Sequence, residues 1–451
     1  MKWFVEMNGF IPRVFINVIS FAYEGIFHEK MSEDVKNFFK DLSYVGLGTI
    51  IATIFSFTFN ILGGRILEPS GYGKFALVQS IAMFLYIPML LGLATALVKY
   101  NAEKEDYNRQ RSIISTTYML VFIFTIISIF IYHLFSSQIS EIFLISKEIF
   151  YLAVFFAVLF VFHALTTNTI GSLHKMRMLS VLQPIHNAVL LAFFLVFILL
   201  NFVSFKSMVF SVYLAYGIIG GVILMSLHKY LIFEFNKPWA KILIRYSRFA
   251  VLGGISFMLY TNIDKILINK YMLLADVGLY NAYYYASINV ISLFSGIFIT
   301  VFFPTVSKYK DKTPIFKRVN KFIPFLIVFG LPFILLSEYL ILKLFGEKYP
   351  INILLMLLFA ITSLLVAWYG IYAWLFNSEG EKGVKITLSG TGTIAITNII
   401  LNIYLIPRIG LYGAIGSTAI AYCIGMCVIY VRRGNILQHR INNDMDGFKN
   451  E

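Results

Sequence analysis

Residues 249–270 read FAVLGGISFMLYTNIDKILINK, an apolar run in which Asp264 and Lys265 stand side by side near the end. Runs of about 18 or more apolar residues recur along the chain, and each is long enough to cross a hydrocarbon layer roughly 30 Å thick. Of the 451 residues, 59% are hydrophobic and 13% are charged. A soluble domain of this size needs far more polar surface to cover its core. The sequence therefore predicts an all-α polytopic membrane protein.

We expect about twelve transmembrane helices joined by short linkers. Alternate linkers and the two ends carry 28 of the 37 Lys and Arg residues, and the opposite set carries 8. Because cytoplasmic loops collect Lys and Arg, this bias places both termini in the cytoplasm, in a multi-pass protein of the plasma (inner) membrane. It also accounts for the net charge of +14 without a nucleic-acid partner. The predicted spans are 44–64, 75–98, 112–135, 149–170, 180–201, 208–233, 246–268, 278–303, 321–342, 351–376, 384–406 and 409–431.

The predicted organisation has four parts. Residues 1–43 contain the apolar but charge-bearing stretch FIPRVFINVISFAYEGIF, which we expect to form a cytoplasmic or interfacial amphipathic segment. Met31 begins MSEDVKNFFKDL, so translation of the first thirty residues is left open. An N-terminal lobe of six helices follows at 44–240, a C-terminal lobe of six at 241–433, and a cytoplasmic tail at 434–451.

The two lobes are expected to be repeats. YGKF at 72–75 and VGLY at 277–280 lie 205 residues apart, and the polar loops at 171–180 and 377–386 have nearly the same offset. This register places Arg65 opposite Lys270 and the Asp264–Lys265 pair opposite Phe59–Asn60. Because each half holds an even number of spans, the repeats would be parallel, related by an axis along the membrane normal, with a substrate path between them.

Three stretches resemble the polysaccharide (O-antigen and capsule) flippases of the multidrug, oligosaccharidyl-lipid and polysaccharide (MOP) exporter superfamily. They are GGRILEPSGYGKFALVQSIAMFLYIPMLLGLATALVKYNAE (63–103), NIDKILINKYMLLADVGLYNAYYYAS (262–287) and LNIYLIPRIGLYGAIGSTAIAY (401–422). The resemblance implies two pseudo-symmetric six-helix lobes of the MATE type and alternating access. It further implies transfer of a polyprenyl-pyrophosphate-linked oligosaccharide to the outer leaflet for surface polysaccharide assembly.

No catalytic or metal-binding motif occurs in the sequence. There is no nucleotide-binding G-x-x-x-x-G-K-[ST] loop, so we expect neither an enzyme nor a cofactor. Cys423 and Cys427 are one helical turn apart, which is poor geometry for a disulfide. His133, His163 and His186 lie in three different spans without metal-ligand spacing, and we interpret them as interior or interfacial residues. The expected partners are therefore the lipid-linked oligosaccharide, membrane lipids, a coupling Na⁺ or H⁺, and other polysaccharide assembly proteins.

Asp264 and Lys265 are the leading candidates for the substrate cavity. Neighbouring side chains on a helix point about 100° apart, so the two cannot neutralise each other as an in-helix pair. Charged residues within a span usually face a wet cavity or a partner. Asp264 is also the candidate for ion coupling. The alternative is that Lys265 snorkels to the outer interface while Asp264 bonds a neighbouring loop.

Four further residues are candidates for substrate contact. Arg65 and Lys270 occupy equivalent places in the repeat. For each of them two roles are open: binding a phosphate, or anchoring its helix at the membrane interface. Asn60 and Asn262 hydrogen-bond sugar hydroxyls or neighbouring helices. Glu338 stands close to Lys343, which suggests an interfacial position. Of the tyrosines at 283–285, at most one or two can face any cavity.

The principal alternative function is a cation-coupled multidrug antiporter of the same superfamily. Its cavity should be acidic, whereas the candidate cavity residues here comprise three cations and one acid. A peptidoglycan-precursor flippase would have two further spans. A membrane enzyme such as a polymerase would show a large extracytoplasmic loop or clustered catalytic residues. The sequence therefore favours the oligosaccharide flippase.

Overall fold

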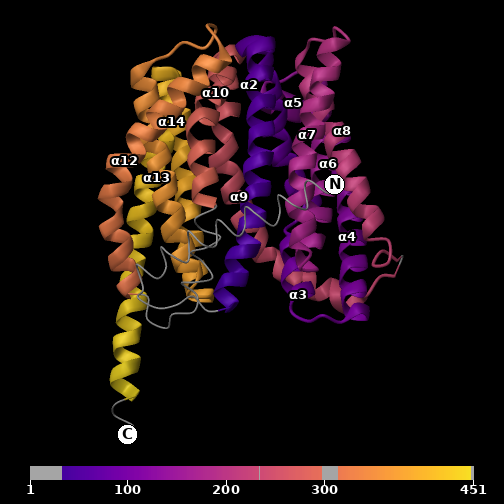
Figure 1. The fold of residues 1–451 in the computed structure, drawn as a ribbon, viewed down its shortest axis with the longest axis vertical. Helices are drawn as coiled ribbons and strands as arrows, with labels where there is room; N and C mark the ends of the chain where they lie inside the picture. The colour runs from indigo at the N-terminus through magenta and orange to yellow at the C-terminus, as the bar shows by residue number, and fades with distance from the viewer. Residues whose placement is uncertain (1–32, 233, 297–312, 448–451) are drawn as a thin grey trace.

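The computed structural model describes residues 33–232, 234–296 and 313–447, and all regular structure in these ranges is helical. Nine helices in the described ranges are long and apolar enough to cross a membrane. The prediction of a polytopic all-α membrane protein is thus confirmed, while the total of twelve spans stays a prediction. The expected N-terminal interfacial segment falls largely outside the described residues. The elements, labelled as in Figure 1, are α2 (Glu33–Leu90), α3 (Leu93–Ala102), α4 (Tyr107–Leu134), α5 (Ser136–Phe143), α6 (Lys147–Ser172), α7 (Met176–Leu199), α8 (Phe205–Ser226), α9 (Lys237–Tyr271), α10 (Leu274–Tyr284), η1 (Tyr285–Asn289), α12 (Thr313–Phe345), α13 (Ile353–Asn377) and α14 (Glu381–Gly447).

The two longest helices are each bent into two arms. α2 leaves helical geometry at Glu68 (φ 56°), directly before Pro69, and α14 does so at Ile409 and Gly410. Proline lacks a backbone N–H and clashes with the preceding turn, which explains a break at this position in α2. Both bends coincide with junctions between predicted spans. We call the end of the bundle that carries these two bends the bend end; it is uppermost in Figure 1.

Two features of the helices were not predicted from the sequence. The predicted span 75–98 is interrupted, because Leu91 (φ 45°) and Gly92 (φ 71°) turn the chain between α2 and α3. A Cβ atom on Gly92 would lie 3.0 Å from the Cβ of Ala250, so glycine permits the close approach of α9 here. The span that follows α10 contains a π-helical segment, η1, between two α-helical stretches.

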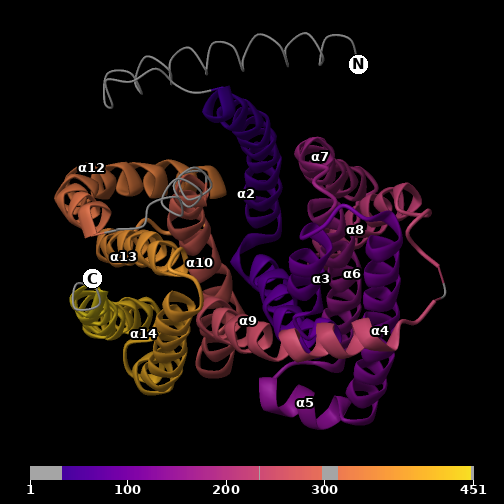
Figure 2. The same ribbon diagram turned by 90° about the horizontal axis from the view of Figure 1, so that it is seen from below.

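The helices form two lobes, seen end-on in Figure 2. α3 to α8 make one group, and α10, α12, α13 and α14 make the other. α2 packs against α6, α7 and α8 of the first group and against α10 of the second. α9 joins the lobes: its Trp239 ring contacts Tyr100 of α3, whereas its later turns pack on α14. The predicted boundary between lobes near residue 240 therefore stays a proposal.

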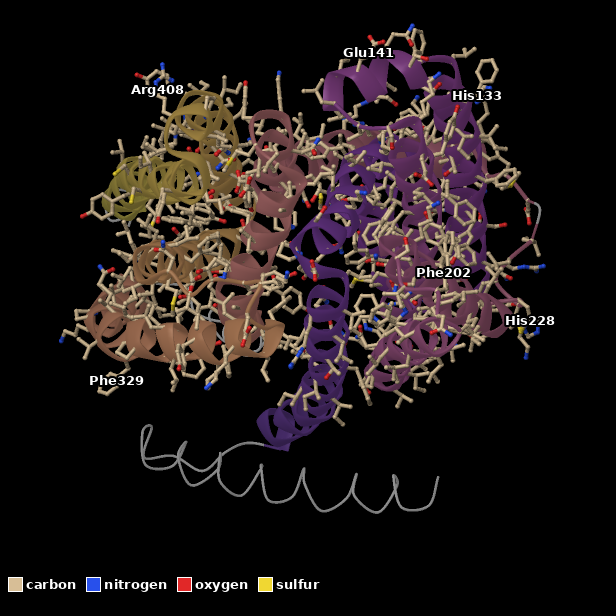
Figure 3. All side chains as sticks on the ribbon, turned by 90° about the horizontal axis from the view of Figure 1, so that it is seen from above. His133, Glu141, Phe202, His228, Phe329 and Arg408 are labelled. Carbon is tan, nitrogen blue, oxygen red and sulfur yellow. The ribbon has the colours of Figure 1, made fainter. Side chains whose placement is uncertain are left out.

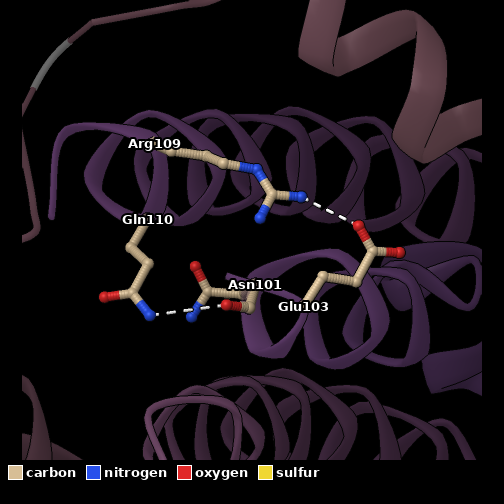
Figure 4. A network of polar contacts seen from close by, with 4 residues as sticks. All are labelled: Asn101, Glu103, Arg109 and Gln110. Atoms are coloured by element: carbon tan, nitrogen blue, oxygen red, sulfur yellow. Dashed lines mark hydrogen bonds and ion pairs between the residues drawn. The ribbon is translucent and has the colours of Figure 1, made fainter. Parts of the chain in front are cut away.

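A compact polar cluster fixes the turn between α3 and α4 (Figure 4). The Asp106 side chain caps α4 by accepting a hydrogen bond from the Arg109 backbone N–H (3.0 Å). The Arg109 guanidinium pairs with Glu103 (2.9 Å), and Gln110 Nε2 donates to the carbonyl oxygen of Asn101 (3.4 Å). A side-chain cap satisfies backbone N–H groups at a helix start that have no partner within the helix. The turn thereby holds α3 in place at the end of the second arm of α2.

Candidate functional site: a cavity between the lobes

A cavity of about 820 Å³ lies between the two lobes. Its walls come from α2, α6, α7 and α8 on one side and from α10, η1, α13 and α14 on the other, together with α9. Cavities of this size hold small-molecule ligands or head groups. The lining is polar and aromatic rather than purely apolar. It contains seven side-chain amides: Asn60, Gln79, Asn187, Asn262, Asn281, Asn289 and Asn377.

Lys265 is the only Asp, Glu, Lys or Arg among the lining residues that the structure describes. Its side chain is 7% exposed, and its ammonium lies 5.0 Å from the centroid of the Tyr284 ring. Within the described part of the chain it has no hydrogen bond and no carboxylate at ion-pair distance. A cation–π contact stabilises a buried ammonium only in part. The described walls of the cavity therefore carry one cation with donors to spare and no acid.

Asp264 turns away from the cavity into a hydrogen-bond network between α9, α10 and α14. It is 2% exposed and accepts hydrogen bonds from Tyr280 (2.6 Å), Asn402 (2.5 Å) and Thr418 (3.0 Å). Asn398 donates to Thr418 (3.0 Å), which extends the network. The divergence of Asp264 and Lys265 is what neighbouring positions on a helix require. These contacts do not match the alternative expectation, in which Asp264 bonds a neighbouring loop and Lys265 extends to the outer interface.

Asn60 and Asn262 both line the cavity. Asn60 Nδ2 donates to the hydroxyl of Tyr285 (3.0 Å), and that hydroxyl shares a hydrogen bond with Ser56 (2.8 Å). These contacts join α2 to η1 across the lobe interface. Asn262 Nδ2 donates to Thr261 (2.9 Å) on its own helix. Of the three consecutive tyrosines, Tyr284 and Tyr285 line the cavity, as expected for residues spread around a helix.

Arg65 and Lys270 lie outside the cavity. Both are exposed at the bend end, where Lys270 lies 5.6 Å from the ring centroid of Tyr271. The exposed residues Glu141 of α5 and Arg408 of α14 mark the edges of the two lobes in Figure 3. Substrate contact by Arg65 or Lys270 in this conformation would require a ligand at the surface, and their role stays a prediction.

The lobes meet at the bend end through two glycines that share the repeat offset of 205. A Cβ on Gly73 of α2 would lie 2.0 Å from the carbonyl oxygen of Leu274, and one on Gly278 of α10 would lie 1.9 Å from that of Pro69. Pro69 and Leu274 have the same offset, so the contact is reciprocal between equivalent positions. Only residues without a Cβ allow backbones to approach this closely.

The cavity is closed at the bend end. Its described lining includes no residue of α2 between 60 and 75 and no residue of α10 before 281. In the opposite direction the lining reaches Asn377, the last residue of α13. A further closing contact is made by the Tyr349 hydroxyl, which donates to the Gly64 carbonyl (3.0 Å). The path from the cavity therefore leads away from the bend end.

Some residues of the site were not predicted. Asn398 and Asn402 are four residues apart in an otherwise apolar span, a pattern that could have marked them as a polar stripe on one helix face. His163 and His186 come together, with ring centroids 4.8 Å apart, and His186 and Tyr216 line the cavity. Their sequence spacing gave no sign of this contact. No cluster of three or more His, Cys, Asp or Glu suited to a metal ion occurs among the described residues.

Comparisons of sequence and fold relate the chain to a protein family and to solved membrane proteins. Residues 38–310 match a family model described as polysaccharide biosynthesis protein. The chain is 24% identical over 400 residues to the uncharacterized membrane protein MJ1375 of Methanocaldococcus jannaschii, covering 84% of this chain and 94% of the relative. The fold is similar to an inward-facing MATE multidrug resistance transporter of the MOP superfamily (TM-score 0.66, 14% identity, 86% of this chain and 96% of that one). It is also similar to the lipid II flippase MurJ in an inward closed conformation (TM-score 0.62, 16% identity, 84% and 86%).

Proposed function

Because the chain belongs to the polysaccharide biosynthesis protein family, we propose that it is a flippase for a polyprenyl-pyrophosphate-linked oligosaccharide. It would carry one repeat unit from the cytoplasmic to the outer leaflet of the plasma membrane by alternating access. The observation that carries the proposal is the cavity lining: seven amides, several aromatic rings, one cation and no acid among the described residues. This chemistry suits a neutral sugar attached to an anionic phosphate.

The proposed task is to remove a solvation barrier. Sugar hydroxyls and phosphate charges lose their hydration on entering hydrocarbon. The loss costs on the order of 2–7 kcal/mol for each unpaired hydroxyl and far more for each unpaired charge. Amides on the cavity wall replace water as hydrogen-bond partners, and ring faces such as those of Tyr284 and Trp374 cover the apolar face of a sugar. The polyprenyl tail can remain in the bilayer beside the gap between the lobes.

Lys265 is proposed to hold the pyrophosphate. It is the one Lys or Arg among the described residues of the cavity wall, and its ammonium can direct three donors at phosphate oxygens. With the cell interior negative, outward movement of an anion is favoured by about 2.3 kcal/mol per charge per 100 mV. Two charges gain roughly 4.6 kcal/mol on that scale. Lys265 must therefore bind strongly enough to admit the head group and weakly enough to release it.

Alternating access is proposed to centre on the glycine contact between α2 and α10. In the present conformation Gly73 and Gly278 seal the bend end, and the cavity lining extends the other way. If both termini are cytoplasmic, as the Lys and Arg bias predicts, the cavity is open to the cytoplasm. Release would then require the two glycines to separate, with the lobes moving about the connecting α9.

Asp264 is proposed to couple transport to Na⁺ or H⁺. Its carboxylate is enclosed by Tyr280, Asn402 and Thr418, which supply oxygen and nitrogen atoms from two other helices. Carboxylate, amide and hydroxyl oxygens suit a hard cation after a small rotation of the amide. Asp264 and Lys265 are adjacent on α9. Binding of Na⁺ or H⁺ at Asp264 would therefore be transmitted to the cavity directly through this helix.

The alternative, a cation-coupled drug antiporter, has less support. A cationic drug would enter a cavity whose described walls present Lys265 and no carboxylate. Like charges without a compensating acid disfavour such a ligand. The fold does not separate the two functions, since both MATE transporters and MurJ share it.

The test is transport by the purified protein in proteoliposomes. We expect it to move a fluorescent polyprenyl-pyrophosphate oligosaccharide between leaflets, measured by protection from a membrane-impermeant quencher. A cationic dye in parallel vesicles should not accumulate against a Na⁺ or H⁺ gradient. Dye transport with no movement of the lipid-linked sugar would favour the antiporter instead.

A further inference from the structure

Glu338 of α12 is a buried acid that the proposed transport pathway does not use. It is 0% exposed, so it packs inside the bundle, and its predicted interfacial depth stays a prediction. Neither carboxyl oxygen has a hydrogen-bond partner among the residues that the structure describes. Lys343, whose proximity in sequence suggested the interface, is exposed and lies with its ammonium 5.9 Å from the Tyr339 ring centroid.

The side chain lies where α12 packs against the π-helical segment η1. In the residue before it, the Ser337 hydroxyl donates to the Ala286 carbonyl in η1 (3.1 Å). The neighbouring Ser287 hydroxyl donates to the Tyr283 carbonyl (2.7 Å). While that hydrogen bond is made, Ser287 has no hydrogen to donate to the Glu338 carboxyl group. Such an oxygen can accept a hydrogen bond from a protonated carboxyl but cannot donate one to a carboxylate.

No cation faces Glu338 from the described elements around it. α13 carries no charged residue, and η1 contributes Tyr285, whose hydroxyl is bonded to α2. On α10 the titratable neighbour is Tyr283, whose hydroxyl donates to the carbonyl of Pro350 (2.5 Å). On α2 the charged residues at this level, Arg65 and Glu68, are exposed at the bend.

An ionised carboxylate in this place would be very costly. The effective penalty of burying an unpaired charge is several kcal/mol even after relaxation. An apolar residue would avoid the problem, and an ionisable residue inside a membrane usually marks a functional site. π-helical turns within α-helices are likewise frequent at functional sites. The two features coincide at the α12–η1 contact.

We propose that Glu338 is a proton-binding site, separate from the Asp264 network, that carries a proton while α12 is packed on η1. Movement of α12 away from η1 would admit water and let the proton leave. The inference concerns a site on the second lobe and does not depend on which substrate the cavity carries.

Infrared spectroscopy of the purified full-length protein tests the proposal. Near neutral pH we expect a protonated-carboxyl band that shifts in D₂O and is lost in Glu338→Gln, which keeps the shape but cannot ionise. Glu347→Gln, at an exposed glutamate on the segment after α12, should retain the band. Asp264→Asn identifies any contribution from that carboxyl.

Two results would overturn the inference. One is a spectrum of Glu338→Gln that keeps the wild-type band, with the protein folded as judged by its elution as a single species. The other is loss of the wild-type band on adding NaCl, which would assign the site to Na⁺ rather than to a proton. If Glu338→Gln does not fold, Glu338→Leu fills the same apolar space and should lose the same band.

Discussion

The glycine contact at the bend end gives the sharpest prediction. Replacing Gly278 by alanine places a Cβ 1.9 Å from the carbonyl oxygen of Pro69, which is 1.5 Å short of the 3.4 Å at which ordinary contact begins. That oxygen belongs to the backbone and cannot rotate away, so α2 and α10 must separate. Overpacking of this kind costs about 1–3 kcal/mol. Because the cost falls on the closed arrangement alone, the equilibrium should shift about 5- to 150-fold toward separated lobes.

Electron–electron double resonance measures this shift directly. Spin labels at Glu141 of α5 and Arg408 of α14, exposed on opposite lobes, report the opening of the bend end, with Cys423 and Cys427 replaced by serine. We expect Gly278→Ala to add or enlarge a long-distance population.

Gly217→Ala in α8 is the matched control, since a Cβ there meets nothing within 4 Å. An unchanged distance distribution in Gly278→Ala would refute the reasoning. So would an equal change in the control.

Three further perturbations test other contacts. Thr418→Val removes a donor to Asp264 and leaves Asn398 without its acceptor, so the free energy of unfolding should fall by about 0.6–1.7 kcal/mol for each lost bond and the midpoint of thermal unfolding in detergent should fall with it; an unchanged midpoint would show that the network contributes nothing. Tyr285→Phe removes the hydroxyl that links η1 to α2, and should raise the open population in the same resonance experiment by about fivefold, as the loss of a bond of about 1 kcal/mol allows; a distribution like that of the wild type would argue against this link. Asp264→Asn should make transport in proteoliposomes independent of an imposed Na⁺ or H⁺ gradient, and retained gradient dependence would exclude the coupling role.

The class of fold could be predicted from the sequence because few backbone conformations are stable in the hydrocarbon layer. A run such as 149–170 has to satisfy its backbone hydrogen bonds internally, and a helix does so. The divergence of Asp264 and Lys265 likewise followed from helix geometry. The partners of Asp264 did not, since Asn402 and Thr418 lie 138 and 154 residues further along the chain and reach it only through helix packing.

The burial of Glu338 could not be inferred from its neighbours in sequence. Lys343 is five residues away and exposed, yet a helix carries these two side chains in different directions and at different depths. The repeat offset indicated that Gly73 and Gly278 are equivalent. It could not indicate that the two glycines are in contact. Residues related by a symmetry axis are equivalent whether they lie close to that axis or far from it.

The central claim is that Lys265 holds an anionic head group in the cavity between the lobes. The direct measurement is the rate at which a fluorescent polyprenyl-pyrophosphate oligosaccharide changes leaflet in proteoliposomes, with Lys265→Ala beside the wild type. Lys206→Ala, at a partly exposed lysine that pairs with Glu148 away from the cavity, is the control. Loss of one desolvated charge-assisted contact of about 1.5–3 kcal/mol predicts a rate at least tenfold lower for Lys265→Ala and unchanged for the control. A wild-type rate in Lys265→Ala would contradict the account.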